Sequence, residues 1–294
     1  MPCVTQKLLV VLSVLCSSAP VGADGAESKA VAFVEKLGGK ITRNSDGSVI
    51  ELWLEGTKIA DADLKELAAF KHLAVLSLYD TQVSDAGLKE LTSSKGLTEL
   101  LLSRTKVTDA GLKDVAKLTH LEKLALDETA VTDAGIGELV PLKRLSELWL
   151  MGTKITDAAF KNVAKLKGLT TLRLDGAKIT GVGLKQVAAI DGFHSLYLSG
   201  TDISEAGLKE IAAFKSLRIL QLSECKITDG GLKELAALDK LTTLHLEKTQ
   251  VTDAGVKSLA SLKKLKVLHL TSTQVTDAGV KTIRNALPKC LVFK

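Results

Sequence analysis

The chain lacks the short motifs that mark the common enzyme classes. No G-x-S-x-G nucleophile turn, H-E-x-x-H zinc-binding pair or glycine-rich phosphate loop occurs in its 294 residues. Serine, histidine and aspartate residues are scattered without a pattern that would assemble a catalytic site. We therefore predict a protein that is not an enzyme and that needs no cofactor.

Long apolar runs are absent except at the N-terminus. Within residues 1–23, Lys7 is the only charged side chain, Leu8–Cys16 forms an apolar core, and Val21–Ala23 is a small-residue cleavage site. This order is typical of a secretory signal peptide, and the run is too short to cross a bilayer as a retained helix. We predict export to the medium, or to the periplasm and cell envelope, without stable membrane insertion.

Cysteine is rare, and we expect no disulfide. Cys3 and Cys16 fall inside the signal segment, where acylation of Cys16 is the less favoured alternative because Leu15 precedes it in place of a small residue. Cys225 and Cys290 lie more than two repeats apart, and strands stack about 4.8 Å apart, so their distance exceeds the roughly 7 Å between Cα atoms that a disulfide tolerates. We predict that both are free and that Cys225 is buried in a turn.

A unit of 24 residues fills most of the chain. The clearest copy is Leu217–Lys240, LRILQLSECKITDGGLKELAALDK, and ten copies occupy residues 49–288 without a change of spacing. They begin at Val49, Leu73, Leu97, Leu121, Leu145, Leu169, Phe193, Leu217, Leu241 and Leu265. A fixed period of this length is the signature of a solenoid.

Each unit predicts a strand, a turn and a short helix. Positions 1, 4 and 6 are apolar, and positions 4 and 6 lie on one face of a strand. The sequence T/S-D-A-G at positions 12–15 predicts a helix start, and apolar positions 16, 19, 20 and 22 form one face of the helix. The sixth unit has Thr180–Gly183 there, without the aspartate, and we expect a weaker start. One unit buries too little to fold alone, so neighbouring units must stack.

The consensus L-x-x-L-x-L-x-x-T-x-I-T-D-A-G-L-K-E-L-A resembles the leucine-rich repeat family, and most closely its cysteine-containing subclass. Leu217–Leu235 carries the subclass cysteine as Cys225, although one residue rather than two separates it from Ile227; other units have threonine there, and Ala177 has neither. The resemblance implies an α/β solenoid, a right-handed horseshoe of ten repeats with parallel strands on the concave face and short helices on the convex face. Similar TDAGL arrays occur in secreted bacterial proteins.

Short segments flank the repeats. Ala30–Leu37 predicts a helix that ends at Gly38-Gly39, and Lys40–Leu54 predicts a hairpin leading into the first unit. We predict that residues 24–48 form an N-terminal cap, because the first repeat would otherwise expose its core. Residues 289–294 are expected to hold a short closing strand.

The large polar aromatic residues gather on the predicted concave face. Positions 2, 3, 5, 7 and 8 of a unit face that side, and they hold every tryptophan and tyrosine of the chain. An unused surface is one explanation, because these rings do not fit a narrow interior, but Trp, Tyr and Arg are also favoured as binding anchors. The predicted patch consists of Trp149, Met151, Arg173 and Tyr197 on successive strands, with Trp53 and Tyr79 as further concave contacts.

Charge is sorted between the two faces. Concave positions carry eleven acids and six bases, although the whole chain has a net charge of +5. The convex lysines at position 17 alternate with glutamates, which is typical of a solvated face and not of a nucleic-acid site. We predict a neutral or basic partner and no nucleic-acid binding.

Two histidines and a glutamate share one end of the concave face. His245 and His269 fall on adjacent strands with Glu247 nearby, a set that could bind a metal. Exposed concave histidines more often act as simple contacts, and we predict no metal.

Three functions are compatible with this pattern. We favour a secreted interaction scaffold that binds a protein or peptide on its concave face, with an unknown oligomeric state. An envelope protein that binds glycan is the alternative. Substrate reception for ubiquitin ligation is implied only by the family resemblance, and it comes with an F-box for which residues 1–48 leave no room.

Overall fold

Twelve short strands form one continuous sheet in the computed structural model, which describes residues 25–294. The strands follow chain order; β1 is antiparallel to β2, and all later neighbours are parallel and in register. They are β1 Lys40–Arg43, β2 Val49–Trp53, β3 Val75–Ser77, β4 Glu99–Leu101, β5 Lys123–Ala125, β6 Glu147–Trp149, β7 Thr171–Arg173, β8 Ser195–Tyr197, β9 Ile219–Gln221, β10 Thr243–His245, β11 Val267–His269 and β12 Leu291–Phe293. The expected signal peptide over residues 1–23, with Cys16, lies outside the described residues.

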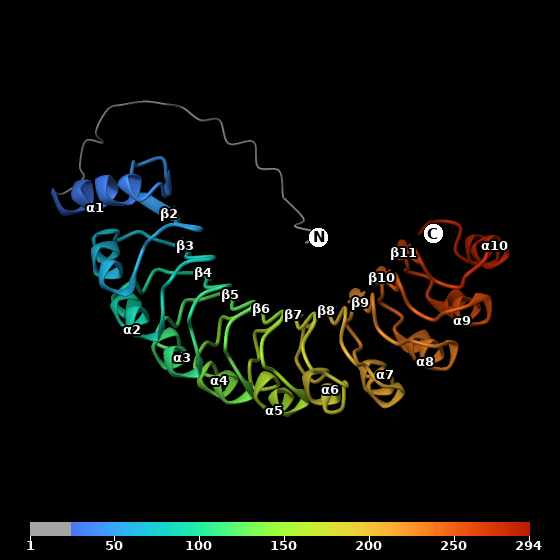
Figure 1. Cartoon of the computed structure of the whole chain (residues 1–294). Coiled ribbons are helices and arrows are strands. Elements are labelled where there is room, and N and C mark those ends of the chain that lie inside the picture. Colours follow the sequence, from blue (N-terminus) through green and yellow to red (C-terminus); the bar gives the residue numbers. More distant parts are fainter. Residues whose placement is uncertain (1–24) are drawn as a thin grey trace.

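Short helices line the outer side of the arc, and the sheet lines its inner side (Figure 1). The α-helices are α1 Gly25–Lys36, α2 Asp85–Leu88, α3 Asp109–Val115, α4 Asp133–Glu138, α5 Phe160–Val163, α6 Leu184–Val187, α7 Glu205–Ile211, α8 Asp229–Glu234, α9 Asp253–Ser258 and α10 Asp277–Ala286. The 3₁₀-helices are η1 Asp61–Ala69, η2 Glu90–Ser93, η3 Asp157–Ala159, η4 Leu235–Ala237 and η5 Leu259–Ser261. This is the strand-turn-helix solenoid that the repeat predicts.

The core is a set of apolar columns that run along the arc. Leu100, Leu124 and Leu148 occupy position 4 of consecutive units, pair in register and are fully buried. The residues at positions 1, 6 and 11 form parallel columns of the same kind, such as Leu121, Leu126 and Val131. Each repeat therefore buries its apolar side chains against the repeats before and after it.

The T-D-A-G segments link one repeat to the next. In the units from the second to the fifth, and again towards the end of the array, the Thr or Ser caps its own helix by accepting a hydrogen bond from the backbone N–H two residues on, as Thr132 does from Ala134. The aspartate does not cap its own helix. Asp109 instead accepts hydrogen bonds from the backbone N–H of Thr132 at 2.8 Å and from its hydroxyl at 2.6 Å, in the following repeat. The T-D-A-G motif thus starts each helix and also links it to the next repeat. We call the resulting series of aspartate–threonine hydrogen bonds the ladder.

The glycine of T-D-A-G makes room for this ladder. A Cβ on Gly111 would lie 2.4 Å from Oδ1 of Asp85 and 2.8 Å from Cδ1 of Leu88, both in the preceding repeat. The fifth unit has Ala159 at this position, and its helix begins as the 3₁₀-helix η3. Glycine is therefore favoured because the neighbouring carboxylate approaches the backbone, although the repeat with Ala159 keeps its ladder bonds from Thr156 to Asp133.

The sixth repeat interrupts the ladder, as its sequence predicts. Gly183 lies at φ +100° at the start of α6, which has no side-chain cap of its own. Glu210 of the next repeat supplies a substitute: its Oε2 accepts from the backbone N–H groups of Gly183 at 2.7 Å and Lys185 at 3.0 Å. A side chain from the neighbour thus replaces the missing cap.

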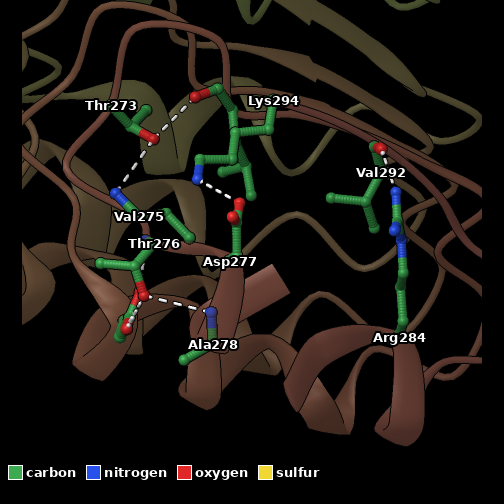
Figure 2. Close-up of polar contacts among 10 residues, drawn as sticks. Thr273, Val275, Thr276, Asp277, Ala278, Arg284, Val292 and Lys294 are labelled. Carbon is green, nitrogen blue, oxygen red and sulfur yellow. Dashed lines mark hydrogen bonds and ion pairs between the residues drawn. The ribbon is translucent and has the colours of Figure 1, made fainter. Parts of the chain in front are cut away.

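Both ends of the described chain cover the stack. Helix α1 and the β1–β2 hairpin lie at one end, with Ala30 and Val34 buried. At the other end, Figure 2 shows Lys294 donating to Asp277 at 2.6 Å and Arg284 donating to the carbonyl of Val292 at 3.1 Å. Asp277 is the last ladder aspartate, and the hydrogen bond and charge of Lys294 lower its pKa.

Position 9 of the unit closes the turn after each strand. In most units its threonine hydroxyl donates to the carbonyl three residues earlier, as Thr129 does to Leu126 at 2.6 Å. Cys225 and Cys290 are free, and Cys225 is buried, as predicted; Cys290 is buried as well. The Sγ of Cys225 lies 3.2 Å from the carbonyl oxygen of Leu198 in the preceding repeat. The single cysteine therefore occupies the interior position that threonine fills elsewhere.

Candidate functional site

Rings and cations alternate across four neighbouring strands of the concave face. Nζ of Lys123 lies 4.5 Å from the ring centroid of Trp149, and Cζ of Arg173 lies 4.8 Å from the same ring. Cζ of Arg173 also lies 5.3 Å from the ring of Tyr197. The four residues, on β5, β6, β7 and β8, form what we call the central cluster, and each cation–π contact restricts the side chains that compose it.

Two acids lie beside the central cluster, both at position 7 of their repeats. Asp127 is buried and accepts hydrogen bonds from the hydroxyl of Ser103 at 3.2 Å and from the backbone N–H of Met151 at 2.8 Å. Burial raises the pKa of Asp127 despite these bonds. Asp175 accepts from the backbone N–H of Ser199 and lies 3.7 Å from Nε of Arg173.

Three buried polar atoms here have no hydrogen-bond partner within residues 25–294. They are Nε1 of Trp149, Nε of Arg173 and Oδ2 of Asp175. Buried polar atoms are nearly always paired in native proteins, so three orphans within one cluster are unusual. Burial also raises the pKa of Tyr197, the fourth member of the cluster. Trp149 and Arg173 thus offer two donors, and Asp175 beside them one acceptor, that form no hydrogen bond, although Arg173 Nε and Asp175 Oδ2 lie 3.7 Å apart as an ion pair.

The structure brings together only part of the predicted patch. Trp149, Arg173 and Tyr197 are in contact through cation–π pairs, whereas Met151 takes part through its backbone N–H. Trp53 lies on β2, four strands away from β6 and so roughly 19 Å along the sheet, and its Nε1 donates to Glu51. Tyr79 contacts Arg104 at 5.7 Å and lies outside the central cluster.

Sequence reasoning missed two parts of the site. Lys123 is one of the six concave bases, and the repeat places it on the strand next to Trp149, but its charge alone does not mark it as a member of the site. Asp127 and Asp175 are two of the eleven concave acids, at position 7, and the pattern predicts that they face water; both are buried, at 8% and 9% exposure. Nothing in the spacing distinguishes a concave side chain that points to water from one held flat against its neighbours.

Concave cations are largely engaged by concave acids. Ion pairs join Arg104 to Glu128 at 2.9 Å, Lys123 to Glu99 at 3.4 Å and Lys248 to Glu224 at 2.6 Å. These pairs join residues of neighbouring repeats and have exposed or half-exposed side chains, so each adds little stability. The net negative charge predicted for this face therefore comes from the acids that form no ion pair with these cations.

A second group occupies the C-terminal end of the concave face. The rings of His245 and His269 stack with centroids 4.3 Å apart, and His269 stacks on Phe293 at 4.6 Å. Oε1 of Glu247 lies 3.1 Å from Nδ1 of His245 and 3.5 Å from Nδ1 of His269, while its Oε2 accepts from the hydroxyl of Ser223. Burial opposes ionisation of Glu247, but the bonds from His245 and Ser223 outweigh it and lower the pKa to about 2.

No helix within residues 25–294 is long and apolar enough to cross a membrane.

Sequence comparison matches three segments to a family model described as leucine-rich repeat, over residues 215–236, 239–260 and 261–283. Together with the in-register strands and the outer helices, this match decides the architecture. The fold is a leucine-rich-repeat solenoid. No curated protein sequence matches the chain.

Solved leucine-rich-repeat structures resemble the chain in fold. The receptor kinase HAESA of Arabidopsis, solved with the peptide hormone IDA and the co-receptor SERK1, superposes with a TM-score of 0.60 at 14% identity, over 86% of this chain and 46% of that one. An internalin from Listeria monocytogenes gives 0.49 at 18% identity over 92% and 95%, and a leucine-rich-repeat protein from Leptospira interrogans gives 0.37 at 21% over 78% and 80%. At 14% identity, the superposition on HAESA supports the fold alone.

Proposed function

We propose that this leucine-rich-repeat protein is a secreted, non-enzymatic scaffold that binds an extended peptide or a peptide segment of a protein on its concave face. The fold itself is typical of protein-interaction domains. The observation that carries the proposal lies at the central cluster and the adjoining Asp175, where Trp149 Nε1 has no hydrogen-bond partner and Arg173 Nε and Asp175 Oδ2 are joined by an ion pair of 3.7 Å, too long for a hydrogen bond. A peptide main chain offers both an acceptor and a donor, and therefore matches this set.

The chemistry of the face favours a neutral or basic partner. Its acids outnumber its bases eleven to six. Complementary charge accelerates association and excludes acidic competitors. HAESA, which has a similar fold, was solved with a peptide hormone, and this precedent agrees with a peptide ligand on a leucine-rich-repeat scaffold.

Glycan binding fits the cluster less well. Sugar rings stack on the free faces of aromatic side chains, but the ring of Trp149 already receives cations from the strands on both sides, at 4.5 Å and 4.8 Å. Binding a sugar there would require displacing Lys123 or Arg173. A peptide main chain would instead bond to the polar groups at the edges of these side chains, without displacing Lys123 or Arg173.

Two finer features belong to the same proposal. We infer export from the signal-like residues 1–23. We also infer a relationship to the cysteine-containing subclass of leucine-rich repeats, with threonine in place of cysteine. The 3.7 Å contact between the hydroxyl of Thr201 and the Sγ of Cys225 supports this, because the two residues occupy equivalent places in adjacent turns.

Selection from a random peptide library, followed by calorimetry, tests the proposal. We expect the selected peptides to be neutral or basic, and to lose about thirtyfold in affinity with Trp149→Ala or Tyr197→Ala, the effect of a hot-spot residue. Lys233→Ala, on the exposed outer side of α8, is the matched control and should leave affinity unchanged. Peptides that bind Trp149→Ala, Arg173→Ala and the unaltered protein equally would contradict the site, and a glycan array signal abolished by Trp149→Ala would favour the glycan alternative.

A further inference from the structure

The geometry of two neighbouring strands brings His245, Glu247 and His269 together. His245 and Glu247 are two residues apart and therefore face the same side of the chain, and His269 pairs in register with His245 on the next strand. Their ligand atoms all lie within 4.8 Å of one another. The three side chains are 20%, 26% and 27% exposed, so the group is accessible to solvent while its surroundings restrict it.

We propose that these three residues bind a divalent transition-metal ion, with zinc as the best-matched ion. Two imidazole nitrogens and one carboxylate oxygen form a donor set that suits zinc and its neighbours, whereas calcium and magnesium prefer sites made of oxygen alone. Three protein ligands leave a fourth position for water or for a donor from a partner.

The distances are close to those of a bound site. Zinc–ligand bonds of about 2.1 Å in a tetrahedral site place two donors about 3.4 Å apart. Oε1 of Glu247 already lies 3.1 Å and 3.5 Å from the two Nδ1 atoms, and the ligand atoms, all within 4.8 Å of one another, must approach by about 1.4 Å at most. The two imidazole planes are 9° apart and must tilt for their nitrogens to converge on one ion. Phe293 also stacks on His269, at 4.6 Å, from the neighbouring strand β12.

Neighbouring groups hold the ligands in the form that a metal requires. Ser223 donates to Oε2 of Glu247, which leaves Oε1 directed between the two histidines. Such outer contacts fix the orientation of metal ligands.

This group goes beyond the concave peptide site. It lies on β10 and β11, two or more strands from the central cluster on β5 to β8, and shares no residue with it. Loss of one site therefore leaves the other intact.

Titration of the tag-free full chain with zinc chloride at about pH 7.5, by calorimetry in a non-chelating buffer, tests the proposal. We expect one equivalent of zinc to bind with a dissociation constant of about 10 µM or tighter. His269→Phe keeps the aromatic stack, Glu247→Gln keeps the shape, and each should weaken binding at least about tenfold; Ser223→Ala should weaken it about tenfold through the outer contact.

His120→Phe removes a histidine outside the group and is the matched control, for which we expect unchanged binding. Circular dichroism verifies the fold of each variant. The proposal is wrong if the chain binds no zinc below about 100 µM, or if folded Glu247→Gln and His269→Phe bind it as tightly as the unaltered protein.

Discussion

At the scale of the residue, the hydroxyl and the carboxylate of the T-D pair have different roles, which their spacing in the sequence does not separate. The T-D pattern predicted a helix cap, and the threonine performs that role, while Asp109 bonds to Thr132 of the next repeat. The sequence predicts that a hydroxyl and a carboxylate stand at the start of the helix. It does not show which neighbour the carboxylate reaches, because that depends on the rise between stacked repeats.

Replacing a ladder aspartate should destabilise the stack. Asp109→Ala removes two hydrogen bonds and leaves the Thr132 N–H without its partner, so we expect about 2 kcal/mol of lost stability. Asp277→Ala is the control: this exposed aspartate accepts from Lys294 instead of a following repeat, and its loss should leave the stability nearly unchanged. Urea unfolding monitored by circular dichroism measures both, and equal losses would contradict the ladder.

The residue at position 8 of every unit has a positive φ, in the left-handed region of backbone conformation. The consensus sequence of the repeat does not reveal this feature. Gly56 has φ +64° and Ser272 has φ +61°, so glycine is only one of the residues found there. Gly56→Ala meets no atom within 4 Å and isolates the backbone strain, for which we expect a loss of about 1 kcal/mol. Ser272→Gly should be neutral or slightly stabilising, and thermal unfolding that shifts in the same direction for both variants would refute this explanation.

Glu247 gives the concave face a pH dependence of known sign. Its pKa is lowered from 4.5 to about 2 in the folded chain, so the unfolded chain binds more protons between these values. Stability supplied by this residue is fully present above about pH 4.5 and is lost as the pH falls towards 2. Glu247→Gln should flatten the decline of the unfolding midpoint in that interval, and a curve identical to that of the unaltered protein would show that the group contributes nothing.

At the scale of the element, contacts with the neighbouring repeat stabilise each outer helix, and the helix is too short to contribute much stability of its own. Most helices span one or two turns, too short to persist alone. Helix α6, which lacks its own cap, receives Glu210 from the next repeat. The sequence predicted the weak start from Thr180–Gly183 but not the compensation, because nothing in the period marks Glu210 as different from the other outer glutamates.

Substitution can distinguish a helix glycine packed tightly against the preceding repeat, such as Gly111, from one with more room around it, such as Gly230. Gly111→Ala places a Cβ 2.4 Å from Oδ1 of Asp85, so we expect a loss of about 2 kcal/mol or more. Gly230→Ala, at the second residue of α8, places a Cβ 3.3 Å from Oε1 of Glu205 and 3.6 Å from Oγ1 of Thr228, and should gain up to about 1 kcal/mol from helix propensity. Chemical unfolding of the pair tests this, and equal effects would mean that close packing is not what selects glycine.

At the scale of the whole molecule, the period predicted the architecture and the side on which each position lies. The twelve strands pair in register, and every tryptophan and tyrosine is on the concave face as predicted. The period could not show that Trp53 stays apart from Trp149, or that Lys123 joins the central cluster, because those outcomes depend on which side chains reach across strands.

Fluorescence of a single tryptophan tests the central claim most directly, since the chain has only Trp53 and Trp149. In a Trp53→Phe variant, a selected peptide should shift the emission of Trp149 in a saturable manner, with the affinity found by calorimetry. In a Trp149→Phe variant, the emission of Trp53 should stay unchanged under the same titration. A response from Trp53 alone, or calorimetric binding with a silent Trp149, would contradict the central cluster as the binding site.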